Sequence, residues 1–303
     1  MLIVRGGALG DFILTLPVLA ALRQAFPDTH LEVLAAPKYG ELAVASGHAD
    51  ATRALESRGL AGFFARKGDL DLFWSEYFAG FNVVLSYLYD PDLFFQSNIA
   101  RVSKAQILVG PHRPDETRNE HAAVQLLRPV EKLAIFDADS SPRLEAARTR
   151  ALQTGEEPSD SRRLLLHPGS GSERKNWPER HWRELLERWA GEGKWQIELV
   201  GGEVEGERLD RLARGLPGVR VVLNEALPNL AVRIAGARLF VGHDSGISHL
   251  AAATGVRGLV LWGPSHEPTW RPRSDRFVSL RHTGGLEGLP PEVVDARVRE
   301  GMG

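Results

Sequence analysis

The stretch FVGHDSGISHLAAATGVRGLVLWGP, residues 240–264, decides the fold of this 303-residue chain. An apolar run at Leu239–Val241 predicts a strand, and the run at Leu259–Trp262 predicts a second one. The small residues between them are typical of a short helix, which a polar turn separates from the first strand. Because strand–turn–helix–strand units build parallel sheets, the stretch predicts an α/β fold.

The polar turn of this stretch is a candidate anion site. The first turn of a helix leaves backbone N–H groups unpaired at the positive end of the helix dipole, so Ser245 and Gly246 could hold a phosphate. His249 lies one turn further along, on the same side as Ser245. The segment alone is equally consistent with a helix cap at Asp244 or Ser245 and a core histidine at His249.

A second anion site is predicted near the centre of the chain. The strand Leu164–His167 breaks into a Gly/Ser run with Ser170, Gly171 and Ser172, and an amphipathic helix follows. Backbone amides of such a run can approach an anion closely, and Lys175 supplies a positive charge that a diphosphate would attract. The run is not a Walker A loop, because no Gly-Lys-Ser/Thr follows it. Taken alone, most Gly/Ser runs of this kind are flexible surface loops.

The amino terminus contributes a third strand–turn–helix segment. The strand Leu2–Val4 leads through a glycine-rich turn that includes Gly10 and Asp11 into a helix, which Pro17 should kink or start. The turn does not have the Gly-x-Gly-x-x-Gly spacing of a dinucleotide site. Asp11 is therefore interpreted either as a helix cap or as a general base.

Short apolar strands alternate with helical patterns along the whole chain, which predicts two doubly wound parallel sheets. The expected domains are residues 1–155 and 156–303, with a boundary in the polar stretch 154–161. The terminal segment Leu289–Met302 is helix-like and is a candidate to pack back across the first domain. The expected strands are Leu2–Val4, Leu31–Leu34, Val83–Ser86, Ile107–Val109, Leu164–His167, Gln196–Val200, Val219–Leu223, Leu239–Val241, Leu259–Trp262 and Phe277–Leu280.

The composition excludes several classes of function. The formal net charge is −2 and neither half of the chain is basic, so nucleic acid is not expected as a partner. The absence of cysteine excludes disulfides and thiolate metal sites. Met1 leads directly into a strand, and the apolar runs are too short to span a membrane. We expect a cytoplasmic protein, at the inner face of the inner membrane if its substrate is lipid-linked, with at most peripheral membrane contact.

No metal site is expected. The three Asp-x-Asp triplets, at residues 69–71, 90–92 and 137–139, match a pattern that can hold a metal-bound diphosphate, but none directly follows an apolar strand. His243, His249 and His266 lack the spacing of a zinc site.

Three segments in this order make the chain similar to glycosyltransferase family nine, the heptosyltransferases of lipopolysaccharide synthesis. They are RGGALGDFILTLPVLAALRQAFPD at residues 5–28, HPGSGSERKNWPERHWREL at 167–185, and HDSGISHLAAATG with LWGPSHEPTW at 243–270. The resemblance implies a GT-B-like fold, in which two Rossmann-like domains face each other across a cleft. The strand Val83–Ser86 lacks an acidic residue that many members carry, and Trp262 replaces a more common Phe or Tyr, which puts the identity of the acceptor in question.

The resemblance also implies roles for individual residues. Asp11 matches the proposed catalytic base on the acceptor side, next to Gly10, and Lys175 approaches the donor diphosphate. Glu203 falls where the family binds the nucleotide ribose, and Glu225 to Leu227 where it contacts adenine. The residues expected to hold the diphosphate are Ser170, Gly171, Ser172, Lys175, Asp244, Ser245, Gly246 and His249.

The function implied is transfer of a heptose from ADP-heptose to a lipopolysaccharide core or related saccharide, with inversion and without a metal or other cofactor. The expected partners are the nucleotide-sugar donor and a saccharide or lipid-linked saccharide acceptor. Three alternatives stay open: transfer from another nucleotide sugar, a sugar-nucleotide epimerase on the same fold, and a non-catalytic sugar-nucleotide-binding protein.

Overall fold

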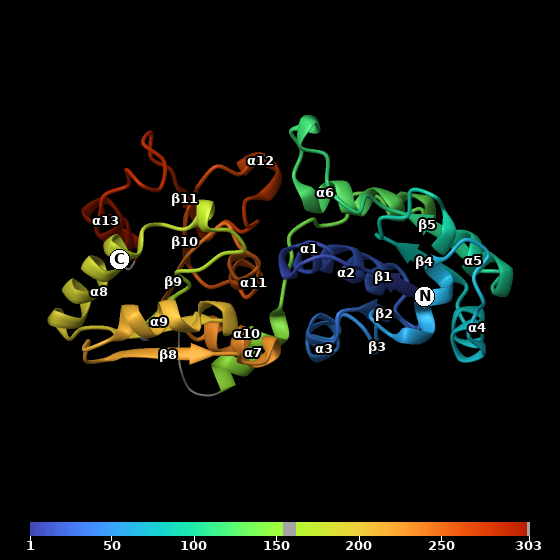
Figure 1. Cartoon of the computed structure of the whole chain (residues 1–303), viewed down its shortest axis with the longest axis horizontal. Helices are drawn as coiled ribbons and strands as arrows, with labels where there is room; N and C mark the ends of the chain where they lie inside the picture. Colours follow the sequence, from blue (N-terminus) through green and yellow to red (C-terminus); the bar gives the residue numbers. More distant parts are fainter. Residues whose placement is uncertain (154–161, 302–303) are drawn as a thin grey trace. The chain divides into compact units, whose positions relative to one another are not determined.

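The computed structural model describes residues 1–153 and 162–301, which form two compact units divided between Ser140 and Ser141 (Figure 1). The predicted boundary at residues 154–161 lies outside the described residues. The division falls before it because α7 (Glu145–Gln153) packs against α10 (Leu227–Ala235) of the second unit.

The first unit contains a five-stranded parallel sheet in the order β3-β2-β1-β4-β5. The register pairs Leu2 of β1 with Glu32 of β2 on one side and with Val84 of β4 on the other. The strands are β1 (Leu2–Val4), β2 (Glu32–Ala35), β3 (Ala51–Ala54), β4 (Val83–Ser86) and β5 (Gln106–Val109).

Helices α1 (Leu9–Ile13) and α2 (Leu16–Ala25) follow β1, with Pro17 in the first turn of α2. The proline therefore marks the start of a new helix, where its missing N–H breaks no hydrogen bond. The other helices of this unit are α3 (Pro37–Ala45), α4 (Leu72–Ala79), α5 (Phe94–Val102), α6 (Ala122–Leu127), η1 (Arg58–Phe64), η2 (Glu116–Arg118) and η3 (Arg128–Leu133).

Strand β3 was not among the expected strands. Its sequence, Ala-Thr-Arg-Ala, has no apolar run, and no residue of it is fully buried because it forms the edge of the sheet. Its pairing with β2, rather than its own composition, makes it a strand.

The second unit contains a six-stranded parallel sheet in the order β11-β10-β9-β6-β7-β8. Its strands are β6 (Arg163–Leu166), β7 (Gln196–Gly201), β8 (Val219–Leu223), β9 (Leu239–His243), β10 (Gly258–Leu261) and β11 (Phe277–Leu280). In addition to α7 and α10, its helices are α8 (Glu179–Glu192), α9 (Gly206–Ala213), α11 (Gly246–Ala253), α12 (Glu267–Trp270), α13 (Pro291–Gly301), η4 (Glu173–Lys175) and η5 (Glu203–Glu205).

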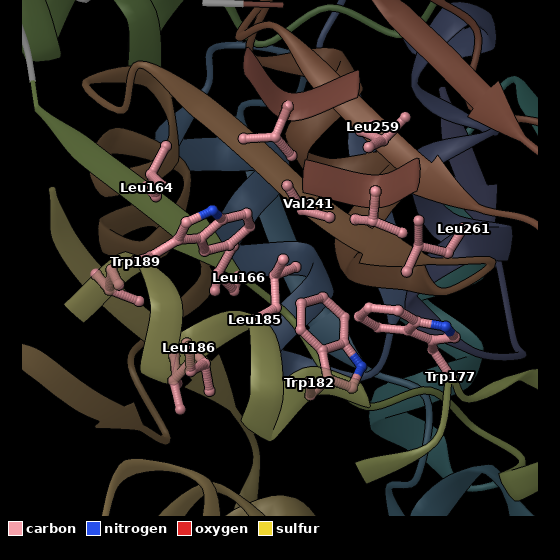
Figure 2. Packing of buried hydrophobic residues seen from close by; sticks show 14 of the residues in the cluster. Leu164, Leu166, Trp177, Trp182, Leu185, Leu186, Trp189, Val241, Leu259 and Leu261 are labelled. Carbon is pink, nitrogen blue, oxygen red and sulfur yellow. The ribbon is translucent and has the colours of Figure 1, made fainter. Parts of the chain in front are cut away.

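Helix α8 covers this sheet with an apolar stripe. Trp182, Leu185, Leu186 and Trp189 recur at helical spacing and are fully buried, as the sequence predicts. Figure 2 shows them against Leu164 and Leu166 of β6, Val241 of β9, and Leu259 and Leu261 of β10. Trp177, just before the helix, meets Trp182 edge to face, with ring centroids 5.1 Å apart. This packing fixes the loop between β6 and α8.

The last helix, α13, belongs to the second unit. Its buried residues Val294 and Val298 join the core around α8, and α13 contacts α8 and β10. The Trp189 indole N–H donates to Asp295 Oδ1 over 2.8 Å. Val294 and Val298 thus find apolar partners within the second unit, and the expected packing of this segment across the first domain stays a prediction.

Both sheets have the strand order of a dinucleotide-binding fold, with one point at which the direction of winding reverses. This switch point lies between β1 and β4 in the first unit and between β6 and β9 in the second. Ligands of open α/β sheets bind at the carboxyl ends of the strands that flank such a point. The polar turns after β1, β6 and β9 lie there.

Asp295→Ala should lower the free energy of unfolding by about 1–3 kcal/mol, because it leaves the buried Trp189 N–H without its acceptor. Urea denaturation measures the change. Glu292→Ala, at an exposed residue of the same helix, should cost less than about 0.5 kcal/mol. Equal losses in the two variants would contradict the anchoring role of Asp295.

Candidate functional site

The site in the second unit is organised around one ion pair. Lys175, in η4 after β6, places Nζ 2.6 Å from Oδ2 of Asp244, which follows β9. The Asp244 side chain is only 7% exposed, whereas that of Lys175 is 35% exposed. Since β6 and β9 are neighbours in the sheet, the pair bridges the switch point. The buried carboxylate thus holds a cation at the edge of the sheet where ligands bind.

His243 fixes the loop that carries Lys175. The backbone N–H of Trp177 donates to His243 Nε2 over 2.9 Å, and Nδ1 lies 3.3 Å from the Gly169 carbonyl oxygen. The tautomer with hydrogen on Nδ1 satisfies both contacts. Burial lowers the pKa of His243 to about 3, so the ring is neutral at pH 7. Both ends of the Gly/Ser loop are therefore pinned to the end of β9.

The serines predicted to hold a diphosphate are fixed by local hydrogen bonds. Ser170 Oγ donates to the Ser172 carbonyl over 2.7 Å and accepts the Ser172 N–H. Ser245 caps α11 by accepting the Ser248 N–H, and its Oγ lies 3.3 Å from Nδ1 of His167. Burial lowers the pKa of His167 to about 4.

The first turn of α11 directs its backbone donors beyond the strand ends. Gly246 and Ile247 occupy the positions whose N–H groups have no acceptor within the helix. His249 is buried on the same helix. The cap and the anion site, which the sequence left as alternatives, are compatible, because capping by Ser245 engages the N–H of Ser248 only.

Glu205 is an acidic residue beside the Gly/Ser loop, and sequence reasoning missed it. Glu203 is exposed at the start of η5, whereas Glu205 accepts the Gly202 N–H at 2.8 Å. A Cβ added at Gly169 would lie 2.6 Å from Glu205 Cγ, so Glu205 packs directly on the strand end. Glu205 could have been identified from its spacing, because an acidic residue three positions after Gly202 is typical of a capping box at the start of a helix.

The other predicted nucleoside residues occupy the start of α10. Glu225 accepts two hydrogen bonds from Arg233, of 2.7 and 3.1 Å, and Arg233 also donates to Glu198. Hydrogen bonding to Glu225 raises the pKa of Arg233. The Glu225 carboxylate is thus engaged by Arg233, and Leu227 begins the helix.

In the first unit, Asp11 lies in α1 beside the end of β1. Its Oδ2 accepts the Ala8 N–H at 3.0 Å, and its Oδ1 lies 3.3 Å from Arg5 Nη2. Gly7 is required next to it, because its φ is +95° and a Cβ there would come within 2.7 Å of Asp11 Oδ2. Gly10 belongs to the same helical turn. The side chain of Asp11 is 28% exposed, so the carboxylate is both oriented and accessible.

Arg5 is the buried partner that orients Asp11. Its side chain is 1% exposed, and Nη1 donates to the carbonyl oxygens of His112 and Tyr87, at 3.1 and 3.5 Å. Burial lowers the pKa of Arg5, and the Asp11 carboxylate opposes that shift. Nothing in the sequence indicates this burial, because an arginine next to a glycine turn is ordinarily exposed.

Two of the Asp-x-Asp triplets cap helices. Asp71 accepts the Trp74 N–H at the start of α4, and Asp90 accepts the N–H groups of Phe95 and Gln96 at the start of α5. Within residues 1–153 and 162–301 no group of three or more His, Asp or Glu side chains is arranged to hold a metal ion. No helix in the same part of the chain is long and apolar enough to cross a membrane.

Solved structures share this fold over the whole chain. Escherichia coli heptosyltransferase WaaC, solved with ADP, aligns with a TM-score of 0.78 at 20% identity, covering 99% of both chains. Escherichia coli ADP-heptose lipopolysaccharide heptosyltransferase II aligns with a TM-score of 0.77 at 17% identity, covering 99% of this chain and 98% of that one. Two Rossmann-like units with polar switch points define the GT-B class of glycosyltransferase folds.

Sequence comparison identifies the family. Residues 112–286 match the model of glycosyltransferase family 9 (heptosyltransferase), and the chain belongs to that family. Lipopolysaccharide heptosyltransferase 1 of Pseudomonas aeruginosa is 43% identical over 104 residues, which are 34% of this chain and 29% of that protein. The Escherichia coli enzyme of the same name is 41% identical over 103 residues, 34% of this chain and 32% of that protein. The aligned segments thus span about a third of these relatives.

The buried residues His167 and His243 predict an acid-sensitive site. Both are neutral in the folded protein, whereas in the unfolded chain they bind a proton below about pH 6.5. The unfolded state therefore binds more protons, and the free energy of unfolding falls as the pH drops from about 6.5 towards 4. The free energy of unfolding should therefore fall less between pH 7 and pH 5 in His243→Gln than in the unmodified protein, by roughly 2 kcal/mol.

Urea denaturation at both pH values measures this difference, with His282→Gln at an exposed histidine as control. An identical pH dependence in the unmodified protein and in His243→Gln would refute the assignment of a neutral, buried His243.

Proposed function

We propose that this protein transfers a heptose from ADP-heptose to a hydroxyl of a lipopolysaccharide core or related saccharide, with inversion and without a metal ion. The observation that carries the proposal is the Lys175–Asp244 ion pair at the switch point of a family 9 chain. In this proposal the second unit binds the donor and the first unit the acceptor.

The diphosphate of the donor binds at Lys175 and at the amides of Ser170–Ser172, Ser245 and Gly246. The positive charge and the helix amino terminus stabilise the charge that develops on the leaving diphosphate. Asp244 cannot itself bind an anion through its carboxylate, so its role is to position Lys175. His243 and His249 complete the buried support of this edge.

Asp11 is the general base. The acceptor oxygen attacks the anomeric carbon as the bond between that carbon and the diphosphate oxygen breaks, and ADP leaves with the bonding electrons. The hydroxyl proton passes to the Asp11 carboxylate. The buried Arg5 orients this carboxylate through their ion pair. Because the reaction is a single displacement, it inverts the configuration at the anomeric carbon.

For the nucleoside, we assign the acidic contact to Glu205 in preference to Glu203, because Glu205 packs on Gly169 next to the diphosphate loop. Glu225 is the weaker candidate for a polar contact, since Arg233 occupies both of its oxygens. The adenine then meets the backbone around Glu225 to Leu227 rather than the Glu225 carboxylate.

The acceptor is a saccharide or lipid-linked saccharide, which would place the enzyme at the inner face of the cytoplasmic membrane through peripheral contact. Transfer from another nucleotide sugar is the second candidate, because the diphosphate contacts do not select the sugar.

The experiment that tests the proposal compares the melting temperature with ADP-heptose, other ADP-sugars and UDP-sugars, followed by turnover with the best ligand. A rise of several degrees with ADP-heptose, and turnover that persists in EDTA, is expected. A larger rise with a UDP-sugar would reject ADP-heptose as donor, and loss of turnover in EDTA that magnesium restores would reject the metal-free mechanism.

Lys175→Ala should weaken ADP binding about 10- to 150-fold, the range of a lost charge-assisted hydrogen bond of 1.5–3 kcal/mol. Calorimetric titration with ADP measures the affinity. Lys194→Ala, at an exposed lysine of the same unit, is the control and should bind ADP as the unmodified protein does. Retention of full affinity by Lys175→Ala would remove this residue from the site.

Asp11→Asn should lower kcat about a hundredfold or more at saturating substrates, because the amide keeps the bond from Ala8 but cannot take a proton. Loss of the charge opposite buried Arg5 should also reduce stability, so turnover is compared well below the melting temperature. Asp28→Asn, at an exposed residue, is the matched control. A rate above about a tenth of the original would make Asp11 a structural cap instead.

A further inference from the structure

A second basic site lies at the opposite, amino-terminal edge of the second sheet. A cavity of about 230 Å³ is formed there by α7, by the connections from α10 to β9 and from α11 to β10, and by the residue before β11. Four arginines line it: Arg148, Arg238, Arg257 and Arg276. Neither Asp nor Glu is present among its lining residues within the described chain.

Two of these arginines converge on Gly255. Arg276 Nη1 donates to the Gly255 carbonyl oxygen over 2.8 Å, and a Cβ added at Gly255 would lie 3.6 Å from Arg148 Nη1. The guanidinium groups therefore share one small volume, although their charges repel each other.

The electrostatics of the cavity are unbalanced. Burial lowers the pKa of Arg276, and the charges of Arg148 and Arg257 lower it further. Arg233, in the same unit, shows the opposite behaviour, because the carboxylates of Glu225 and Glu198 raise its pKa. Arg148, Arg257 and Arg276 thus place three positive charges at a cavity that no Asp or Glu of the described chain lines.

Helix capping explains only part of the cluster. Arg276 and Arg257 each donate one N–H to a carbonyl at a helix end, those of Gly255 and Gly301 respectively. A guanidinium has five N–H donors, so most of their capacity remains. The Arg148 side chain makes no hydrogen bond or ion pair with any described residue, and capping therefore gives no reason for its position.

A neighbouring cavity provides a contrast. It has a volume of about 390 Å³ and shares Arg257 and Arg276, but Asp275, Arg297 and Glu300 also line it. Arg297 donates to Glu300 over 2.7 Å. Two carboxylates offset two of its three arginines, so the four-arginine cavity is the stronger attractor of an anion.

We propose that the four-arginine cavity binds a phosphate group, as a second anion site at the opposite edge of the sheet from Lys175. Guanidinium groups match phosphate oxygens in pairs of parallel hydrogen bonds, and Arg148 and Arg276 are close enough to act on one anion. The phosphate belongs either to a free small molecule or to an anionic lipid headgroup, and the two sources present the same chemistry to the arginines.

The first arm of the test uses inorganic pyrophosphate and the full chain carrying Lys175→Ala, so that the donor site contributes little. Pyrophosphate, against chloride of equal ionic strength, should raise the melting temperature. Adding Arg148→Gln and Arg276→Gln should weaken the apparent affinity at least tenfold. The matched control, Lys194→Gln with Arg220→Gln, removes two exposed charges outside the cavity and should change it less than twofold.

The second arm measures sedimentation with phosphatidylcholine vesicles that contain or lack phosphatidylglycerol. Binding to the phosphatidylglycerol vesicles that Arg148→Gln with Arg276→Gln abolishes, and the control pair retains, identifies a lipid headgroup as the source. If pyrophosphate raises the melting temperature but the protein does not bind the phosphatidylglycerol vesicles, the source of the phosphate is a free small molecule.

Arg148→Gln alone breaks no side-chain hydrogen bond or ion pair within the described chain, and it replaces the double variant in the test if that variant does not fold. Failure of both probes to bind, or equal effects of the cavity and control substitutions, would overturn the proposal.

Discussion

The burial of one charge at each switch point is the constraint on which both sites depend. In the second unit the carboxylate of Asp244 is buried, and the exposed partner is the cation of Lys175. In the first unit the cation of Arg5 is buried, and the partly exposed partner is the carboxylate of Asp11. Removing one partner of such a pair would leave an uncompensated buried charge, at a cost of about 3–5 kcal/mol. Each exposed group is thereby held in one place.

The sign of the buried charge gives each unit its part in the proposed reaction. A buried carboxylate presents a cation, which suits a diphosphate, and a buried guanidinium presents a carboxylate, which suits a hydroxyl proton. The neutral His243 adds the rigidity that the donor side needs, because it ties Gly169 and Trp177 to the end of β9. Trp177, at the end of this loop, packs against Trp182 of α8 in the hydrophobic core.

The second sheet also separates two kinds of positive charge. At its carboxyl edge, Lys175 is paired with the buried carboxylate of Asp244. At its amino edge, Arg148 and Arg276 approach each other with no carboxylate lining their cavity in the described chain. Parallel strands place these edges at opposite ends of the same layer, so two anions could bind to one unit without sharing a residue.

The sequence by itself determined the α/β class, nine of the ten expected strands to within one residue at each end, and the motifs at the strand ends. Apolar runs and turn residues determine local structure, so they can be recognised in the sequence without knowledge of the fold. Only the tertiary structure decided that β3 is a strand, that α13 packs on α8, and that Glu205 rather than Glu203 reaches Gly169. It alone brought Asp244 to Lys175, 69 residues away in the chain, and buried Arg5. These outcomes depend on which residues become neighbours through the parallel pairing of strands. Such pairing brings together segments that are far apart in the chain, and the local sequence of one segment does not indicate which other segment it will contact.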